Sequence, residues 1–351
     1  MAFFSLLLAL TFPQSAEPSI QRISGPEGTT ATLVQNAALG HTSQFLAADE
    51  FSGSLQDEQK SVFDQLNAAL KDCGSRPADV VRLSIYARDT ATAKATRQYL
   101  NNWFPPDAKP TISVVQTPLP NSRRLAIDAV FVAHRSTLEG VVIHKGKKGQ
   151  PAHVSVLPQG DVVYVSGQAE PGELGTATRR TLESLQRTLE HLRLDRKQIV
   201  HIKCFLQPMA QVAVVNHEIE AFFSASPIPA VSHVEWIAGG TRPIEIEVVA
   251  ATPLTNTSET VSYSTPPDMK SSPVFSRVAR IHGNRRVYVS ALVSKAASVP
   301  RTAVHDIYQQ LISTLKPTRS NLRHLAKATY YVSDPNVSAT LNRIRPHYYD
   351  P

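Results

Sequence analysis

Hydrophobic residues recur with two different periods through the middle of the chain. Residues 153–157 and 162–168 are β-rich runs, and the Pro158-Gln-Gly-Asp161 segment between them predicts a hairpin turn. Residues 176–192 then carry apolar side chains at positions 182, 185, 189 and 192. This i, i+3, i+7 spacing predicts a helix with one buried face.

Further elements follow in the same segment. A buried strand, a second amphipathic helix and two more strands are predicted at residues 199–206, 212–223, 231–237 and 244–251, with a turn at Gly239-Gly240. The order ββαβαββ predicts an α+β fold, in which a mixed sheet carries both helices on one face. A lone unit would leave the other, apolar face of its sheet in water, so that face must be buried against something else.

The same pattern occurs three times in the chain. One leucine of the first helix and one aromatic residue of the following strand recur at the same two offsets, 119 and then 126 residues. The landmarks are Leu66, Leu185 and Leu311 in the helix and Tyr86, Phe205 and Tyr331 in the strand. Two independent landmarks agree, which indicates a tandem repeat.

The repeat divides the chain into copy 1 (residues 20–135), copy 2 (residues 151–252) and copy 3 (residues 273–351). Polar linkers at 135–150 and 252–272 would let the copies cover one another's apolar sheet faces as an intramolecular pseudo-trimer. Copy 3 stops before the position of its last two strands, which would leave a sheet edge unfinished. The sequence is therefore expected to be a fragment, or else the assembly tolerates a partial third unit.

The charge distribution argues against nucleic-acid binding, and the cysteine positions argue against a disulfide. The 36 Lys and Arg residues against 29 Asp and Glu give a net charge of +7, but the charges are scattered, so nucleic-acid binding is not favoured. The two cysteines, Cys73 and Cys204, are placed by the repeat at a helix end and in mid-strand. That is poor geometry for a disulfide, and both are expected to be buried thiols.

The N-terminus suggests a targeting segment. Residues 1–12 form an apolar run too short to span a bilayer, and Ser15 and Ala16 could mark a cleavage site. A signal peptide over residues 1–16 would export the protein to the periplasm or the cell exterior. No Lys or Arg precedes the run, so the alternative is a mis-assigned start or a buried segment in a cytoplasmic protein. No other stretch is apolar enough to cross a membrane.

Copy 2 resembles the RidA (YjgF, L-PSP) family. The resemblance rests on Val162-Val-Tyr-Val-Ser-Gly-Gln168, on Val215-Asn216 followed by Phe222, and on the closing Glu245-Ile-Glu247. It implies a chorismate-mutase-like fold that forms trimers with ligand sites in the clefts between subunits. It also implies hydrolysis of enamines and imines, such as 2-aminoacrylate, to 2-keto acids and ammonia. No cofactor and no metal are expected.

The residue that would hold the substrate carboxylate is absent. The family places an arginine in Pro-Ala-Arg-Ser, whereas copy 2 has Val231 and copy 1 has Ile112 at that position. A guanidinium pairs with both carboxylate oxygens through its planar fork, and an aliphatic side chain cannot. Losing such a charge-assisted pair in a sheltered site costs several kcal/mol, so both sites are expected to be degenerate.

Other family positions are retained in part. Glu245 matches a glutamate expected to position water or shuttle a proton, although a solvent-facing strand residue is the alternative. Copy 1 has Ala126 where copy 2 has Glu245, Arg97 where copy 2 has Asn216, and Ala47-Ala48 where copy 2 has Ser166-Gly167. The candidate ligand-binding residues are Ser166, Gly167, Asn216, His153, Ser290 and Asn342, with Phe275 or a neighbour replacing His153 in copy 3.

Three functions follow as hypotheses. The first is a small-molecule-binding relative, a pseudoenzyme whose ligand is a 2-keto acid, an enamine or a similar molecule. The second is a working enamine/imine deaminase in which another cation, such as Arg242 or Arg179, replaces the lost arginine. The third is RNA binding or endoribonuclease activity, which is the weakest because aromatic-plus-basic strand motifs are missing.

Overall fold

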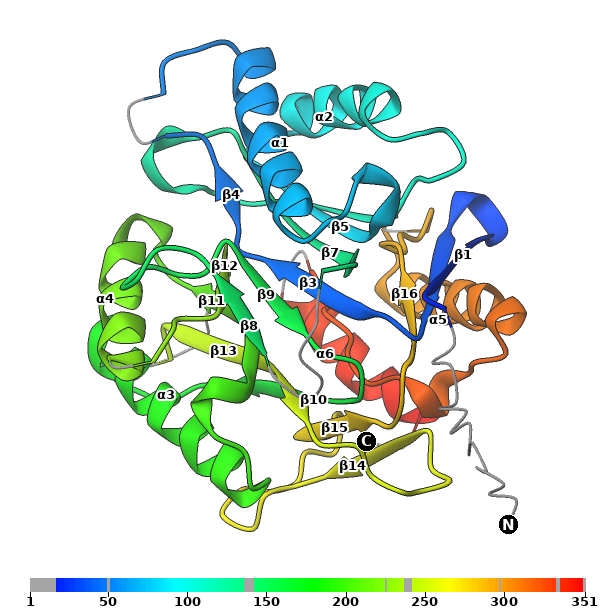
Figure 1. The fold of residues 1–351 in the computed structure, drawn as a ribbon. Helices are drawn as coiled ribbons and strands as arrows, with labels where there is room; N and C mark the ends of the chain where they lie inside the picture. The colour runs from blue at the N-terminus through cyan, green and yellow to red at the C-terminus, as the bar shows by residue number, and fades with distance from the viewer. Residues whose placement is uncertain are drawn as a thin grey trace, which may run out of the picture.

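The computed structural model describes residues 17–48, 51–135, 142–224, 226–236, 242–296, 298–332 and 335–349. The expected signal peptide and the Gly239-Gly240 turn lie outside these residues. In Figure 1, α1 and α2 lie at the top, α3 and α4 at the lower left and α5 at the right, with the strands between them. The molecule is an α+β protein built from three tandem copies around a pseudo-threefold axis.

The elements of each copy follow the predicted order closely. Copy 1 contains β2 (Thr30–Gln35), β3 (Ala38–Thr42), β4 (Phe45–Leu46), α1 (Leu55–Asp72), β5 (Val80–Ala87), α2 (Thr90–Trp103), β6 (Thr111–Gln116) and β7 (Leu125–Ala133). Copy 2 contains β9 (Val154–Leu157), β10 (Asp161–Gln168), α3 (Leu174–His191), β11 (Ile199–Leu206), α4 (Val212–Phe223), β12 (Ala230–Glu235) and β13 (Ile244–Thr252). Copy 3 contains β15 (Val278–Ile281), β16 (Arg285–Val289), α5 (Pro300–Leu315) and α6 (Pro335–Ile344).

Local sequence explains where the helices begin and which face they bury. Helix α1 starts after Ser54, whose hydroxyl accepts the Asp57 N–H while the Asp57 carboxylate accepts the Ser54 N–H, a capping box that contributes about 1 kcal/mol. Helix α3 buries Leu182, Leu185 and Leu189, the residues that predicted it. These leucines pack on the helix-facing side of β10, β11 and β13, so both helices of copy 2 cover one face of a mixed sheet, as predicted.

The predicted hairpin between the first two strands of a copy is wrong. Strand β9 does not pair with β10; it pairs with β3 of copy 1, while β10 pairs with β15 of copy 3 and β16 pairs with β2 of copy 1. The first strand of every copy is thus added to the sheet of another copy, in a closed cycle. Strand breaks are visible in sequence, but both partners offer the same backbone groups, so the local pattern does not say which one is chosen.

The linkers also contribute strands. Strands β8 (Ile143–Lys145) and β14 (Val261–Ser264) lie in the two predicted linkers and pair with β9 and β15. Strand β1 (Ser19–Ser24) pairs with β2 in the same way. The resulting sheets run β6-β5-β7-β3-β9-β8, with β4 on β7, then β12-β11-β13-β10-β15-β14, and β1-β2-β16.

The sheet faces away from the helices bury one another, as predicted from the bare face of a single unit. Leu39, Val130, Val162 and Val249 come from strands of copies 1 and 2 and form one apolar cluster, against which Tyr288 of copy 3 packs. Leu39 and Val162 are fully buried. Because burying such a side chain contributes about 1.5–3 kcal/mol, this cluster holds the three copies together.

Copy 3 departs from the other two. Residues 325–332 align with β5 and β11 but form no strand, and Tyr331 and Val332 are 48% and 42% exposed. In copies 1 and 2 the central strands β7 and β13 pair with β5 and β11. The described part of copy 3 contains no equivalent of β7 or β13. The backbone of residues 325–332 therefore lacks the neighbour that would make it a strand.

Cys73 caps α1 and Cys204 lies within β11, and both are buried free thiols, as predicted. Among the described helices, none is long and apolar enough to cross a membrane.

Candidate functional site

A serine at the end of the second strand marks the same junction in all three copies. The N–H groups of Ser43, Ser166 and Ser290 donate to the carbonyls of His153, Arg277 and Thr30 at 3.1, 2.9 and 2.9 Å. The serine equivalent to Ser166 in copy 1 is therefore Ser43, and the alignment with Ala47-Ala48 is wrong. Helix α1 begins 12 residues after Ser43, whereas α3 begins only 8 residues after Ser166, so the helix offset does not apply to the serine.

Two of the three junctions are closed by direct hydrogen bonds. At the junction of copies 1 and 2, the Gln44 N–H donates to the Val231 carbonyl at 2.9 Å, and the Val231 N–H donates to Ser43 Oγ at 2.9 Å. At the junction of copies 3 and 1, the Ala291 N–H donates to the Ile112 carbonyl at 3.1 Å. The side chains of Val231 and Ile112 pack in the helix-side cores of their own copies. Neither side chain carries a positive charge that could pair with a carboxylate.

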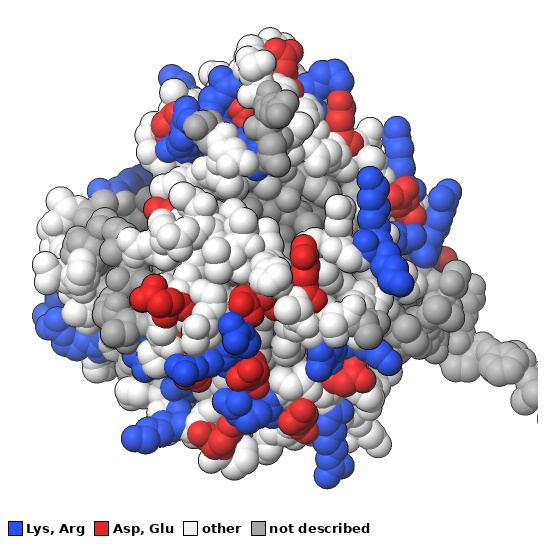
Figure 2. Space-filling view, turned by 90° about the vertical axis from the view of Figure 1, so that its left-hand side faces the viewer, with Lys and Arg blue, Asp and Glu red and all other residues white. Residues whose placement is uncertain are grey.

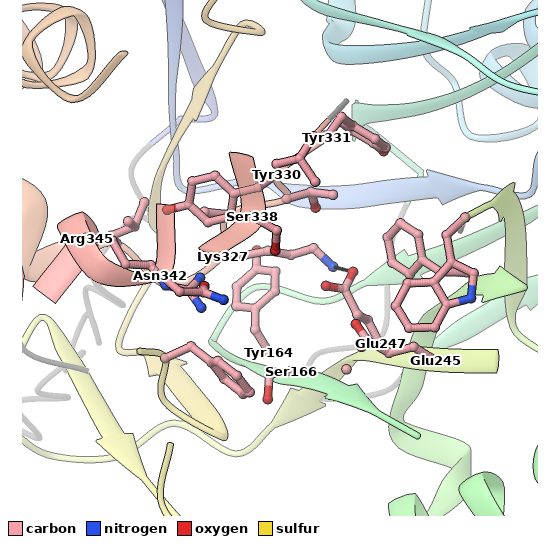
Figure 3. A pocket seen from close by; sticks show the side chains of 18 of the residues that line it. Tyr164, Ser166, Glu245, Glu247, Lys327, Tyr330, Tyr331, Ser338, Asn342 and Arg345 are labelled. Atoms are coloured by element: carbon pink, nitrogen blue, oxygen red, sulfur yellow. Dashed lines mark hydrogen bonds and ion pairs between the residues drawn. The ribbon is translucent and has the colours of Figure 1, made fainter. Parts of the chain in front are cut away.

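The third junction, between copies 2 and 3, is open. The described residues of copy 3 include no strand equivalent to β6 or β12, and a cavity of about 1740 Å³ lies there. Its wall contains Ser166, Gly167 and Glu245 from copy 2 and Asn342 from copy 3, four of the residues predicted from the sequence. Figure 3 shows Asn342 and Arg345 on one side of this cavity and Glu245 and Glu247 on the other, with Lys327 between them.

Glu245 is the most perturbed acid in the cavity wall. Burial, and then the neighbouring charge of Glu247, raise the pKa of Glu245 to about 7. Its carboxyl group lies directly over Gly167, since a Cβ at Gly167 would be 2.0 Å from Glu245 Oε1. Gly167 is therefore required for this close approach. A carboxyl with a pKa near neutrality can take up or release a proton at physiological pH.

Lys327 and Glu247 form an ion pair across the same wall. Lys327 Nζ lies 2.5 Å from Glu247 Oε2, and their side chains are 26% and 12% exposed. Figure 3 draws this contact as a dashed line below Tyr331. Because its charge is compensated by Glu247, Lys327 is not free to pair with an anionic ligand.

Arg345 supplies a guanidinium that the sequence reading missed. It is 9% exposed and lies over the rings of Phe275 and Tyr330, with centroid distances of 5.8 and 5.6 Å. Its Nε has no hydrogen-bond partner, and no ion pair of Arg345 occurs within the part of the chain that the structure describes. It lies in the turn that follows α6, and only the presence of an arginine next to a helix end could have pointed to it.

Several predicted residues lie elsewhere. Asn216 projects from α4, and its buried Oδ1 lacks a hydrogen-bond partner. His153 pairs with Asp72 at the surface at 2.9 Å, and Ser290 Oγ accepts the Thr30 N–H at 3.0 Å. None of the three lines the cavity, whereas Phe275 does.

The two arginines suggested as substitutes are also outside it. Arg179 pairs with Glu218 on the outer face of the helices, and Arg242 Nε donates to the Ala169 carbonyl at 3.1 Å. Over the described residues, no group of three His, Cys, Asp or Glu side chains is placed to hold a metal ion.

Sequence comparison finds a matching family model, described as Endoribonuclease L-PSP, over residues 38–133 and 149–252. Similar solved structures include a Rid-family protein of unknown function, YyfB, from Yersinia pestis (19% identity, 32% of this chain and 97% of that chain, TM-score 0.28). Others are Rv2704 of the YjgF/YER057c/UK114 family from Mycobacterium tuberculosis (21%, 26% and 79%, 0.25) and E. coli TdcF with bound serine (20%, 31% and 98%, 0.25). No curated protein sequence matches the chain.

Proposed function

Since the chain belongs to the Endoribonuclease L-PSP family, also called RidA or YjgF, we propose that it binds one small carboxylate-bearing molecule between copies 2 and 3. The proposal rests on one observation. Of the three junctions, this one gathers the retained motif residues Ser166, Gly167 and Glu245 around a cavity that also contains the guanidinium of Arg345.

The chemistry of the wall favours an acid with a short polar head. Arg345 is held by two aromatic rings and offers hydrogen bonds that no described protein group uses. A carboxylate is the best partner for its planar fork. Phe275 and Tyr330 would cover an apolar part of the ligand, and Ser166 and Asn342 could orient its polar atoms. The two closed junctions, with Val231 and Ile112, are not part of the site.

Titration calorimetry with pyruvate as the probe tests the proposal. The wild-type protein should bind pyruvate saturably, and Arg345→Gln should weaken binding about tenfold or more, because a charge-assisted pair is lost. Arg179→Gln is the matched control, since Arg179 is exposed on α3 and paired with Glu218. Equal binding by wild type and Arg345→Gln would contradict the assignment of this cavity.

A second candidate function is hydrolysis of an enamine or imine, which the raised pKa of Glu245 favours. As a carboxylate, Glu245 would take a proton from water as the water oxygen bonds to the imine carbon. Glu245 then returns that proton to the nitrogen, and the carbinolamine releases ammonia as its hydroxyl proton passes to the departing nitrogen and the C=O bond of the 2-keto acid forms. An enamine enters this sequence after it tautomerises to the imine. A 2-aminoacrylate enamine generated in situ should yield pyruvate, with a rate that rises through about pH 7 and is lost in Glu245→Gln. A rate equal to the uncatalysed background would contradict hydrolysis and support only the binding function.

No observation favours RNA as the substrate, although the family description names an endoribonuclease. On the face shown in Figure 2, basic and acidic side chains are interspersed and form no continuous basic surface. A path for a phosphate backbone requires such a surface.

A further inference from the structure

The three copies meet across a layer of polar side chains that the proposed function does not use. Arg82, His201 and Lys327 occupy equivalent positions, because they are separated by the repeat offsets of 119 and 126 residues. The strand register supports this equivalence, since Arg82 and His201 lie opposite corresponding residues of β6 and β7 and of β12 and β13. Each points away from the helices, toward the axis that relates the copies.

Positions on the same and on neighbouring strands add further polar groups to this axial layer. Tyr86 Oη donates to Asp128 Oδ2 at 2.5 Å, and Lys203 Nζ donates to Tyr86 Oη at 3.1 Å. The rings of His41 and His201 face each other with centroids 6.0 Å apart. The axial layer, as the name is used below, consists of His41, Arg82, Tyr86, Asp128, Tyr164, His201, Lys203, Glu247, Arg286, Tyr288, Lys327 and Tyr331.

Positive charge is in excess in the axial layer. The cations are Arg82, Lys203, Arg286 and Lys327, and the carboxylates are Asp128 and Glu247, with Glu245 at the cavity side. Lys327 is neutralised by Glu247 at 2.5 Å. Burial alone would raise the pKa of Asp128, but Lys203 and Arg82 outweigh it and hold that pKa at about 2. Asp128 thus interacts electrostatically with both cations, but among the described residues neither Arg82 nor Lys203 lies close enough to a carboxylate to form an ion pair.

Unused hydrogen-bonding groups face the same space. His41 is 6% exposed, and its Nε2 has no hydrogen-bond partner; the same holds for Nε of Arg286, a residue 4% exposed. Burial lowers the pKa of His41 to about 3, so its ring is neutral and can still donate one N–H. Native proteins rarely leave such groups buried without a partner, so an occupant that accepts hydrogen bonds is expected.

The axial layer lies beside open space. Arg82 and His201 are only half-buried, although they lie at the centre of the molecule, which requires open space beside them. The cavity between copies 2 and 3 is lined by Tyr164, Glu247 and Lys327, which belong to this layer as well. The cavity therefore borders the axial layer.

We propose that a small oxyanion binds at the pseudo-threefold axis, held by Arg82, Lys203 and the His41–His201 pair. Its negative charge compensates the excess cation, and its oxygens accept hydrogen bonds from guanidinium, ammonium and imidazole groups that lack carboxylate partners. This site differs from the carboxylate site at Arg345, because its binding residues come from copies 1 and 2, and it does not depend on the function proposed for that site.

Calorimetric titration of the full chain with inorganic phosphate tests the axial site, with sodium chloride at equal ionic strength as the reference. Wild type should bind phosphate saturably. Arg82→Gln should weaken binding about tenfold or more, because a guanidinium contact to the anion is lost. His41→Phe keeps an aromatic ring at this position and removes both ring nitrogens, including the unpartnered Nε2, so it should fold but bind phosphate several-fold more weakly.

Two control variants separate this site from others. Arg345→Gln should weaken pyruvate binding about tenfold or more but leave phosphate binding unchanged, and Arg179→Gln should retain both. If Arg82→Gln does not fold, as judged by circular dichroism, the phosphate binding of His41→Phe tests the axial site instead. The proposal is overturned by an absence of saturable binding beyond the chloride reference, by unchanged binding in His41→Phe, or by loss of phosphate binding in Arg345→Gln.

Discussion

The junction of copies 1 and 2 and the junction of copies 2 and 3 use the same parts with opposite results. Both have a serine at the end of the second strand, Ser43 and Ser166, whose N–H pairs with the following copy. At the first, β12 lies against the serine and is hydrogen-bonded to it through Val231. At the second, no described strand takes that place, and a cavity remains. The presence of the neighbouring strand, more than the serine motif, decides whether a junction can hold a ligand.

The strongest test of this contrast restores the family arginine at the closed junction. Val231→Arg would place a guanidinium among core residues without a partner, so it should reduce the free energy of unfolding by about 3–5 kcal/mol. Urea unfolding followed by circular dichroism measures the loss. Ala339→Arg, at an exposed position in the cavity wall, is the control and should change stability by about 0.5 kcal/mol or less.

A stable Val231→Arg protein that gains pyruvate binding would show that the first junction can open. In that case the absence of an arginine, and not closure by β12, would be the reason that copy 2 contributes no second site.

Alanine at the junction serines should separate the closed from the open type. Ser43 Oγ accepts the Val231 N–H and donates to the Ala152 carbonyl at 2.7 Å, so Ser43→Ala leaves a buried donor unsatisfied and should cost about 2–3 kcal/mol. Ser166 Oγ only donates to the Arg277 carbonyl at 3.0 Å, and Ser166→Ala should cost about 0.5–1.5 kcal/mol. Unfolding free energies from urea titration give both values, and equal costs would contradict the difference between the junctions.

The sequence predicted the elements of copy 2 almost residue by residue, because apolar periodicity reports directly which face of a helix or strand is buried. It could not predict the exchange of first strands, since β9 has the same pattern whether it pairs with β10 or with β3. A single helix offset also misplaced the serine of copy 1, because four more residues precede α1 after Ser43 than precede α3 after Ser166.

At the candidate site too, some residues could be predicted from the sequence and others could not. Ser166, Gly167 and Glu245 were identified by their resemblance to family motifs, and they do share a wall. Asn216 and His153 matched equally well but lie elsewhere, because a motif position fixes a place on an element and not what packs against it. Arg345 was missed since it belongs to no motif; its place depends on α6 packing against α5 and the cavity.

The open junction should make stability depend on pH through Glu245. Its pKa in the folded protein is about 7, above the ordinary 4.5, so the folded state holds the proton more tightly. The contribution of Glu245 to stability is therefore greatest below pH 4.5, falls as the pH rises to 7 and is constant above. Allowing for solvent screening, the loss should be about 1–2 kcal/mol. Glu245→Gln should lack it, and thermal unfolding across this range compares the two proteins; parallel pH profiles would exclude Glu245 as the cause.

The smallest expected effect concerns the close approach of Gly167 and Glu245. A Cβ at residue 167 would lie 2.0 Å from Glu245 Oε1 and 2.5 Å from its Cγ, so Gly167→Ala must push that side chain out of its buried position. The net cost should be about 1 kcal/mol, because the glutamate regains contact with water. Once solvated, Glu245 should have a lower pKa, and the pH dependence of stability should shift below pH 7. The Glu245→Ala background provides the control, since there Gly167→Ala meets no carboxyl and should cost less than in wild type. If both backgrounds lose the same stability, the strain does not lie between these two residues, and the raised pKa of Glu245 has a cause other than its packing on Gly167.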